Sequence, residues 1–302
     1  MLKARPRGPW GTLRAILAGM FKRQTSGSVV CTSCGYLVGV NDDTCYNCGR
    51  RNPGLWGFAP AFRRLGHDLG FVHFMTAACL IVYGLTLLMT GPGALGGGGL
   101  FNILSPSSYV LAQFGASGAV PVFRLGRWWT VLSASWLHAS VLHIAFNVMW
   151  IRQLAPAVAE LYGPGRTVIV YTVAGVCGFG LSTIAGQYLW FMPSILRGAG
   201  LTVGASASIF GLLGALVYYG RRTGSSLVHG QAMSWAVTMF IFGLIMPGVD
   251  NFAHAGGFAG GFIAGRLLDP LKPERVDHIV IAVGCLLLSI VSILASLLVP
   301  LR

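Results

Sequence analysis

Seven long apolar segments, separated by short polar stretches, dominate this chain. They cover residues 70–91, 131–151, 167–187, 205–220, 230–248, 251–268 and 279–299. A helix needs roughly 20 apolar residues to cross the hydrocarbon core of a bilayer. Only 10% of the residues are charged, against about 25% in soluble domains. The pattern predicts an all-α polytopic membrane protein with seven spans, of which the fourth to the sixth are short.

Glycine is frequent, with 43 residues in the chain. Small residues allow membrane helices to approach one another closely. In the sixth segment Gly256 and Gly260, Gly257 and Gly261, and Gly261 and Gly265 are each four residues apart. We therefore expect this helix to pack closely against its neighbours.

The basic residues predict how the chain is oriented. With a cytosolic N-terminus, the inner side receives all but four of the 21 Lys and Arg residues, the exceptions being Arg124, Arg127, Arg197 and Arg302. The positive-inside rule then favours an N-in, C-out protein, which we expect in the cell membrane. The net charge of +13 requires no nucleic acid, because anionic lipid of the inner leaflet is a sufficient partner.

A polar part, residues 1–69, precedes the first apolar segment. Because it contains no uninterrupted apolar stretch before a cleavage site, we expect no cleaved signal peptide. Residues 1–30 are basic, and residues 13–21 carry apolar side chains at helical spacing between basic residues. This pattern fits an interfacial amphipathic helix, and a short helix packed on a neighbouring domain fits it equally well.

Four cysteines in this polar part form two C-x-x-C-G turns: Cys31 and Cys34, then Cys45 and Cys48. Four thiolates at this spacing fit a tetrahedral zinc ion. Redox pairs or disulfides are the alternative, which the expected cytosolic location disfavours. We predict a four-cysteine zinc ribbon over residues 31–50 and a juxtamembrane linker over 51–69. The ribbon has no open coordination position, so we expect a structural role or a cytosolic protein partner.

A serine and a histidine lie in two separate apolar segments. Ser206 follows Gly204 at the start of the fourth segment, and His254 lies in the first turns of the sixth. Ionisable groups are costly in a bilayer, which makes this histidine a functional-site candidate. In the predicted orientation both segments begin outside, at similar shallow depth. We predict a Ser–His dyad, with Phe210, one turn after Ser206, packed on the imidazole.

The second segment carries further polar side chains. His143 and Asn147 are four residues apart and share a helix face. They can donate hydrogen bonds to an oxyanion, but a polar clasp between helices fits the pair equally. His138 is predicted in the same helix, pointing elsewhere.

Two further residues are candidates for the predicted site: Asp250 as a third member of a triad and Ser117 as an alternative nucleophile. Asp250 is the one acid near the outer surface and close to His254, and we expect it to cap the following helix more than to complete a triad. Ser117, in Gly115-Ala116-Ser117-Gly118, also has a serine motif. No apolar helix follows it, so we rank Ser206 above Ser117.

These motifs together resemble the rhomboid family of intramembrane serine proteases. The H-x4-H-x3-N run, the G-x-S motif and the D-N-x-x-H-x-G-G run occur in family order over roughly residues 65–270. The resemblance implies a six-helix core over 70–270, with 271–302 as an added C-terminal transmembrane helix and the cysteine module as an appendage.

The resemblance also implies roles for individual residues. Ser206 would be the nucleophile and His254 the general base. His143, Asn147 and the Ser206 amide would form the oxyanion hole. The supporting positions would be His138, Phe210, Gly204, Gly257 and Gly261.

Two positions depart from the family pattern. Ala207 stands where glycine is common, which adds a methyl group beside the nucleophile and could narrow the oxyanion region. Thr130 follows the long predicted outer loop of about residues 92–128, at a position where the family usually has arginine, although Arg127 is nearby.

The expected activity is hydrolysis of peptide bonds in or near transmembrane segments of membrane proteins, with no cofactor for catalysis. The alternative is a non-proteolytic rhomboid-like protein that binds membrane helices. A transporter is a third possibility, but the chain lacks paired broken helices.

Overall fold

A computed structural model of the chain describes residues 23–32, 34–60, 68–95, 103–193, 196–246 and 248–301. The chain divides into two compact units. The smaller comprises Met1–Gly70 with Pro273–Arg275, and the larger comprises Phe71–Lys272 with Val276–Arg302. The amphipathic segment predicted over 13–21 lies outside the described residues.

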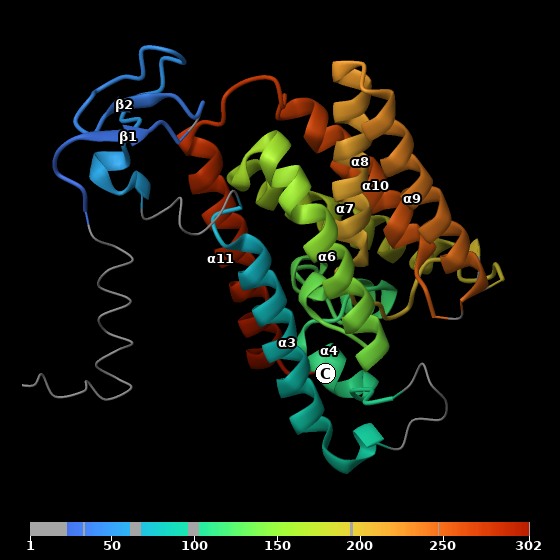
Figure 1. The fold of residues 1–302 in the computed structure, drawn as a ribbon. Coiled ribbons are helices and arrows are strands. Elements are labelled where there is room, and N and C mark those ends of the chain that lie inside the picture. The colour runs from blue at the N-terminus through green and yellow to red at the C-terminus, as the bar shows by residue number, and fades with distance from the viewer. Residues whose placement is uncertain are drawn as a thin grey trace, which may run out of the picture. The chain divides into compact units, whose positions relative to one another are not determined.

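Seven long helices lie in the described part of the larger unit (Figure 1). They are α3 (Phe71–Thr90), α6 (Val141–Tyr162), α7 (Pro164–Tyr188), α8 (Ser206–Thr223), α9 (Ser226–Ile245), α10 (Asn251–Leu267) and α11 (Val276–Leu298). Within the described residues, α3, α6, α7, α9 and α11 are long and apolar enough to cross a membrane. The chain is thus a mostly helical, multi-pass membrane protein. Of the two remaining helices, α10 has 17 residues, and α8 carries Arg221 and Arg222 in its last turn.

The second apolar segment does not form one helix, so the predicted span 131–151 is wrong. Its first part forms α5 (Thr130–Ser133) and the 3-10 helix η5 (Ala134–Trp136), after which Leu137 is extended. Ser140 then accepts a hydrogen bond from the His143 amide and caps α6. A hydropathy pattern does not detect this break, because the residues on both sides of the cap are apolar.

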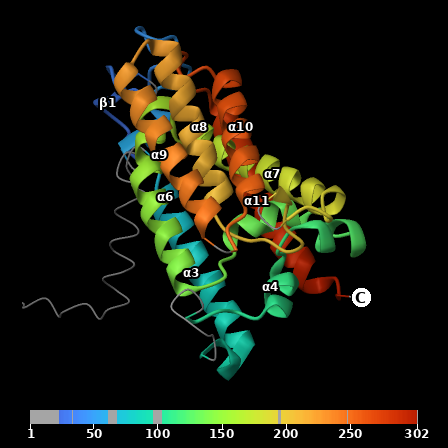
Figure 2. The same cartoon turned by 90° about the vertical axis from the view of Figure 1, so that its right-hand side faces the viewer.

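Helix α8 packs between α9 and α10, and α7 packs against both α8 and α10 (Figure 2 shows α8 between its two neighbours). Gly257 of α10 faces the α8 backbone, where an added Cβ would lie 2.8 Å from the carbonyl carbon of Ala207. Gly260 of α10 faces α7, where an added Cβ would lie 2.9 Å from the Cys177 sulfur. The predicted close packing of the sixth segment is confirmed, and glycine makes it possible.

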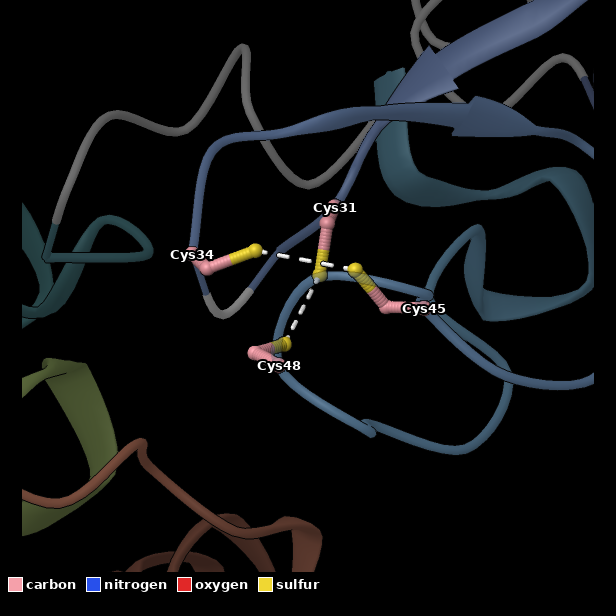
Figure 3. A group of neighbouring side chains, drawn as sticks. All are labelled: Cys31, Cys34, Cys45 and Cys48. Carbon is pink, nitrogen blue, oxygen red and sulfur yellow. Dashed lines mark hydrogen bonds between the residues drawn. The ribbon is translucent and has the colours of Figure 1, made fainter.

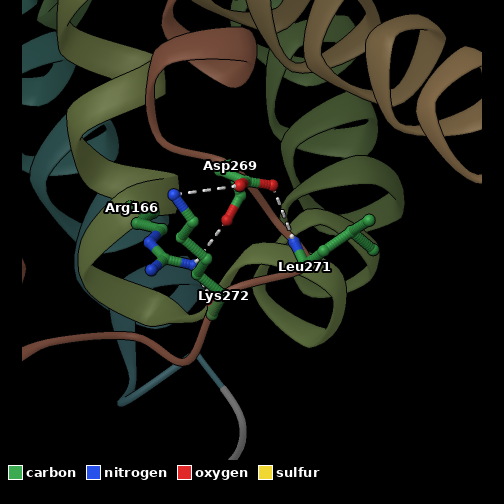
Figure 4. A network of polar contacts seen from close by, with 4 residues as sticks. All are labelled: Arg166, Asp269, Leu271 and Lys272. Carbon is green, nitrogen blue, oxygen red and sulfur yellow. Dashed lines mark hydrogen bonds and ion pairs between the residues drawn. The ribbon is translucent and has the colours of Figure 1, made fainter.

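Polar contacts fix the chain after α10 (Figure 4). Asp269 accepts a hydrogen bond from the Leu271 amide at 3.3 Å and pairs with Lys272 at 3.5 Å. The buried Arg166 of α7 donates to the Asp269 and Lys272 carbonyls at 3.3 and 2.7 Å. A single guanidinium therefore holds the turn that leads from α10 towards α11.

The segment that joins α3 to α5, which we call the outer segment after its predicted location, contains the 3-10 helix η2 (Gly91–Leu95), α4 (Ser108–Phe114) and the π-helix η4 (Val120–Arg124). Leu111 and Phe114 of α4 are buried together with Leu137, and Leu201 and Val203 pack beside them. The segment also pairs with the loop before α8 through a bridge between Ser117 and Thr202. It therefore connects the start of α6 with the start of α8.

The smaller unit contains a two-stranded antiparallel sheet. Strand β1 (Ser28–Val30) pairs with β2 (Leu37–Gly39), and Val29 lies opposite Val38. The 3-10 helix η1 (Leu55–Gly57) follows. A small apolar cluster around Val29 and Val38 includes Cys31 and Cys45. Such a core is small for a fold of this kind, which is typical of a module that a metal stabilises.

Candidate active site

The turn before α8 presents Ser206 as the first residue of that helix. Gly204 has a φ of +130°, and its amide donates to the Ala134 carbonyl at 2.9 Å. A Cβ built on Gly204 would lie 2.6 Å from Nε2 of His143. Glycine is therefore required here by its backbone conformation and by the imidazole that faces it.

Ser206 and His254 are in hydrogen-bond contact. Oγ of Ser206 lies 3.0 Å from Nε2 of His254, although the two residues are 48 positions apart in the sequence. His254 lies in the first turn of α10 and is 6% exposed. The Phe210 ring stacks on the imidazole, with 4.2 Å between the ring centroids and 15° between the planes. The imidazole is thus held in position from two sides.

The surroundings of Nδ1 of His254 show whether an acid could complete a catalytic triad. Its Nδ1 atom is buried and has no hydrogen-bond partner among the described residues. Asp250 caps α10 instead: it accepts from the Ala253 amide at 3.0 Å and from the Ser182 hydroxyl. The predicted capping role of Asp250 is confirmed. The arrangement is a Ser–His pair without an acid that orients the histidine.

His143 points its Nε2 atom towards the Gly204 turn. Its Nδ1 atom accepts a hydrogen bond from the Ala139 amide at 3.3 Å. A neutral imidazole carries its proton on one nitrogen, so this bond leaves Nε2 as the donor. Asn147 is 4% exposed and donates to the His143 carbonyl at 2.9 Å, which leaves one further N–H on its amide group. The N-cap residue of α8 is Ala205, whose side chain makes no capping hydrogen bond, so the amides of the first turn are candidates to bind an anion.

His138 lies in the loop that precedes α6, so its predicted place within that helix is wrong. The cap at Ser140 makes the helix begin only after this residue. His138 is 1% exposed, and its ring packs on the His143 ring with 5.2 Å between centroids. His138 therefore contacts the site through His143.

Ser117 is fully buried at the bridge to Thr202, and its hydroxyl accepts from Thr130 at 3.4 Å. Within the described part of the chain, no histidine forms a hydrogen bond with it. Ala207 is also fully buried, and a Cβ on Gly178 of α7 would lie 2.8 Å from its methyl group. The methyl group thus occupies space that Gly178 leaves open.

Two hollows approach the Ser–His pair, and the sequence contained no signal for either. A cavity of about 640 Å³ is lined by His143, by the loop 197–203, by the end of α9 and by residues 248–251. An apolar groove of about 320 Å³ is lined by His254 and Phe210 together with side chains of α9. Both are built from loops and helices far apart in the sequence, and the first borders His143 whereas the second borders His254.

The four cysteines form a separate candidate metal centre (Figure 3). Their sulfurs lie within 4.8 Å of one another, with 3.8 Å between Cys31 and Cys48 and 3.6 Å between Cys34 and Cys45. Tetrahedral Zn–S bonds of about 2.3 Å require S···S distances of about 3.8 Å. The glycines after the two pairs, Gly35 and Gly49, have φ of +76° and +71°. The cluster is therefore able to bind a metal ion.

The surroundings change the acidity of two of these thiols in opposite directions. Burial opposes ionisation of Cys34, yet hydrogen bonds from the Asn47 side chain and other neighbours lower its pKa to about 6. Burial raises the pKa of Cys48 to about 12. Sulfurs this close ionise together only when a cation offsets their charge.

The fold and the site define a class: a polytopic membrane protein with a serine and a histidine paired inside its helix bundle. Residues 125–270 match the Rhomboid domain. The chain is 32% identical over 167 residues to Rhomboid protease GluP of Bacillus subtilis, covering 54% of this chain and 30% of that protein. It is 32% identical over 171 residues to RHOMBOID-like protein 7 of Arabidopsis thaliana, covering 55% of this chain and 51% of that protein. The chain therefore contains a Rhomboid domain, and both Ser206 and His254 lie within it.

Proposed function

We propose that this protein is an intramembrane serine endopeptidase that cleaves membrane proteins in or near their transmembrane segments. The observation that carries the proposal is the 3.0 Å contact between Oγ of Ser206 and Nε2 of His254. The name of the similar Bacillus protein, a rhomboid protease, supports the same activity. Because the chain spans only 30% of that protein and about half of the Arabidopsis relative, the activity is our proposal for this chain.

In the proposed first step, Oγ of Ser206 attacks the peptide carbonyl and its proton moves to Nε2 of His254. The negative charge on the former carbonyl oxygen is stabilised by Nε2–H of His143, the remaining Nδ2–H of Asn147 and the Ser206 amide. His254 then gives its proton to the leaving amine as the C–N bond breaks. A water molecule deprotonated by His254 attacks the acyl-enzyme ester, and His254 returns the proton to Oγ of Ser206 as the acyl–oxygen bond breaks.

The fold that we propose for this reaction has a six-helix core, consisting of α3 and α6 to α10, with α11 as an added seventh helix. The distribution of Lys and Arg supports an orientation with a cytosolic N-terminus. The α8 and α10 N-termini, with Ser206 and His254, would then lie near the outer face of the cell membrane. Water would enter from that side through the cavity beside His143.

For the smaller unit we propose a structural zinc site formed by Cys31, Cys34, Cys45 and Cys48. When bound, zinc would link the two C-x-x-C turns and stabilise the fold, with no role in the chemistry at Ser206. Metal analysis of the purified full chain should give roughly one equivalent of zinc. A Cys45→Ser variant should lose it, whereas Cys285→Ser, in α11, should retain it. Equal zinc in both variants would contradict the site.

Proteolysis in liposomes separates the proposed activity from helix binding alone. Wild-type protein, Ser206→Ala and Ser117→Ala would each be reconstituted with a single-span substrate whose helix contains small residues. Mass spectrometry should find a product cut within or beside the span with wild type and Ser117→Ala, and none with Ser206→Ala. Substrate that co-purifies with the wild type and stays intact would favour the binding-protein alternative.

A further inference from the structure

The outer end of α11 presents a row of buried serines to the segment that precedes α5. Ser292 donates its hydroxyl to the Trp129 carbonyl at 2.7 Å, and Ser296 accepts from Nε1 of Trp129 at 3.0 Å. Ser289, one turn earlier and equally buried, donates its hydroxyl to the Cys285 carbonyl of its own helix at 3.0 Å. Two of the three serines thus hold Trp129 through its backbone and its ring.

Arg127 binds the same end of α11. Its guanidinium is buried and donates to the carbonyls of Ser296 and Val299, the latter at 3.3 Å, and to that of Ala112 in α4 at 2.6 Å. The last carbonyls of a helix have no partner within it, and a cation there complements the helix dipole. No carboxylate pairs with Arg127 within the described residues. Arg127 therefore caps α11 and joins it to the outer segment.

Hydrogen bonds connect the outer segment with the chain just before Ser206. Trp129 precedes α5 and η5, where the Ala134 carbonyl accepts the Gly204 amide at 2.9 Å, two residues before Ser206. The Ser133 hydroxyl donates to the Gly115 carbonyl at 2.7 Å. Two residues later, the backbones of Ser117 and Thr202 exchange hydrogen bonds of 3.0 and 2.7 Å. Short backbone stretches and hydrogen bonds thus connect α11 with the Gly204 amide and with Thr202, next to the turn that presents Ser206.

We propose that α11 is a positioning element of the active site: its C-terminal end, hydrogen-bonded to Arg127 and Trp129, keeps the Gly204–Ser206 turn aligned with His254. The proposal rests on the proposed function of Ser206 and His254. The proposal gives α11, which lies outside the proposed six-helix core, a role in the reaction. It also explains how the outer segment is anchored when residue 130 is threonine, because Arg127 supplies the guanidinium and α11 supplies its acceptors.

The test uses the full chain with substitutions that remove single hydrogen bonds. Ser292→Ala and Trp129→Phe, alone and combined, remove contacts between α11 and the outer segment. Ser289→Ala is the matched control, because it deletes an equally buried hydroxyl of the same helix whose hydrogen bond goes to the Cys285 carbonyl of α11. For each variant we would measure kcat and KM for a transmembrane substrate, the thermal midpoint, and hydrogen exchange of the Ser117 and Thr202 amides.

The double variant should lower kcat about tenfold with little change in KM, and the Ser117 and Thr202 amides should exchange faster. Ser289→Ala should leave kcat and exchange unchanged, and Arg127→Lys should retain more activity than Arg127→Ala. The proposal is overturned if the double variant matches Ser289→Ala in both kcat and exchange. Absence of any cleavage by the wild type would contradict the proposed function instead, and the exchange data would still report whether α11 holds the turn.

Discussion

Two glycine–serine turns lie next to each other in this molecule, at residues 115–118 and 204–206, and their surroundings differ. Ser117 is fully buried, and its hydroxyl accepts from Thr130. Ser206 begins α8, and its hydroxyl lies 3.0 Å from His254 on the neighbouring helix. The first turn is joined to the backbone just before the second turn, through Ser117 and Thr202. A glycine–serine sequence therefore does not define a site by itself. Ser206 differs from Ser117 because a histidine on the closely packed neighbouring helix α10 faces its hydroxyl.

The largest effect should separate the two serines. Ser206→Ala and His254→Ala should each lower kcat by at least about 10⁴-fold, because nucleophile and base act as a unit. Ser117→Ala should keep kcat within about twofold, since only a buried hydrogen bond is lost, at about 1 kcal/mol of folding stability. Steady-state cleavage of one transmembrane substrate measures all three. A Ser117→Ala variant as inactive as Ser206→Ala would reverse the comparison.

His143 next to the second turn sharpens the comparison. His143→Ala should lower kcat by about 10²–10³-fold with a small change in KM, the usual cost of losing one oxyanion donor. The alternative role, a clasp between helices, predicts a lower thermal midpoint and an unchanged kcat. Measuring kcat and the midpoint on the same preparation distinguishes the two roles.

Disturbing the packing of α10 on α8 should lower kcat almost as much. Gly257→Ala places a methyl group against the Ala207 backbone and should move His254 away from Ser206, with a loss of about 10² in kcat. Gly180→Ala, on α7, is the matched control because its added Cβ meets no atom within 4 Å. Equal activity in the two variants would show that the helix contact does not set the geometry of the pair.

The smallest effect should come from Ala207→Gly. The Ala207 methyl group fills space beside Gly178, so its removal should cost about 1 kcal/mol of stability and change kcat by less than about threefold. Chemical denaturation and cleavage assays measure these two quantities. A tenfold rise in kcat would mean instead that the methyl group narrows the oxyanion region.

The sequence predicted the long helices well wherever apolar runs and helix boundaries coincide. The first and sixth segments, 70–91 and 251–268, match α3 and α10 within two residues at each end. The second segment failed because Ser140 caps α6 in the middle of an apolar run, and a capping bond depends on local geometry more than on hydropathy.

The polar residues of the site were found because such groups are rare in apolar segments. The partners of Arg127 were not found, since Ser296 and Val299 lie some 170 positions away in the sequence. The cavity beside His143 was missed for a related reason. Its walls come from several loops whose proximity depends on the tertiary fold.

The most direct test of the central claim is labelling of detergent-solubilised protein by a fluorophosphonate, with the modified residue located by mass spectrometry. The account predicts a single adduct on Ser206, abolished in Ser206→Ala and His254→Ala and retained in Ser117→Ala. An adduct on Ser117, or labelling of Ser206 that persists in His254→Ala, would contradict the claim that the contact between α8 and α10 creates the reactive serine.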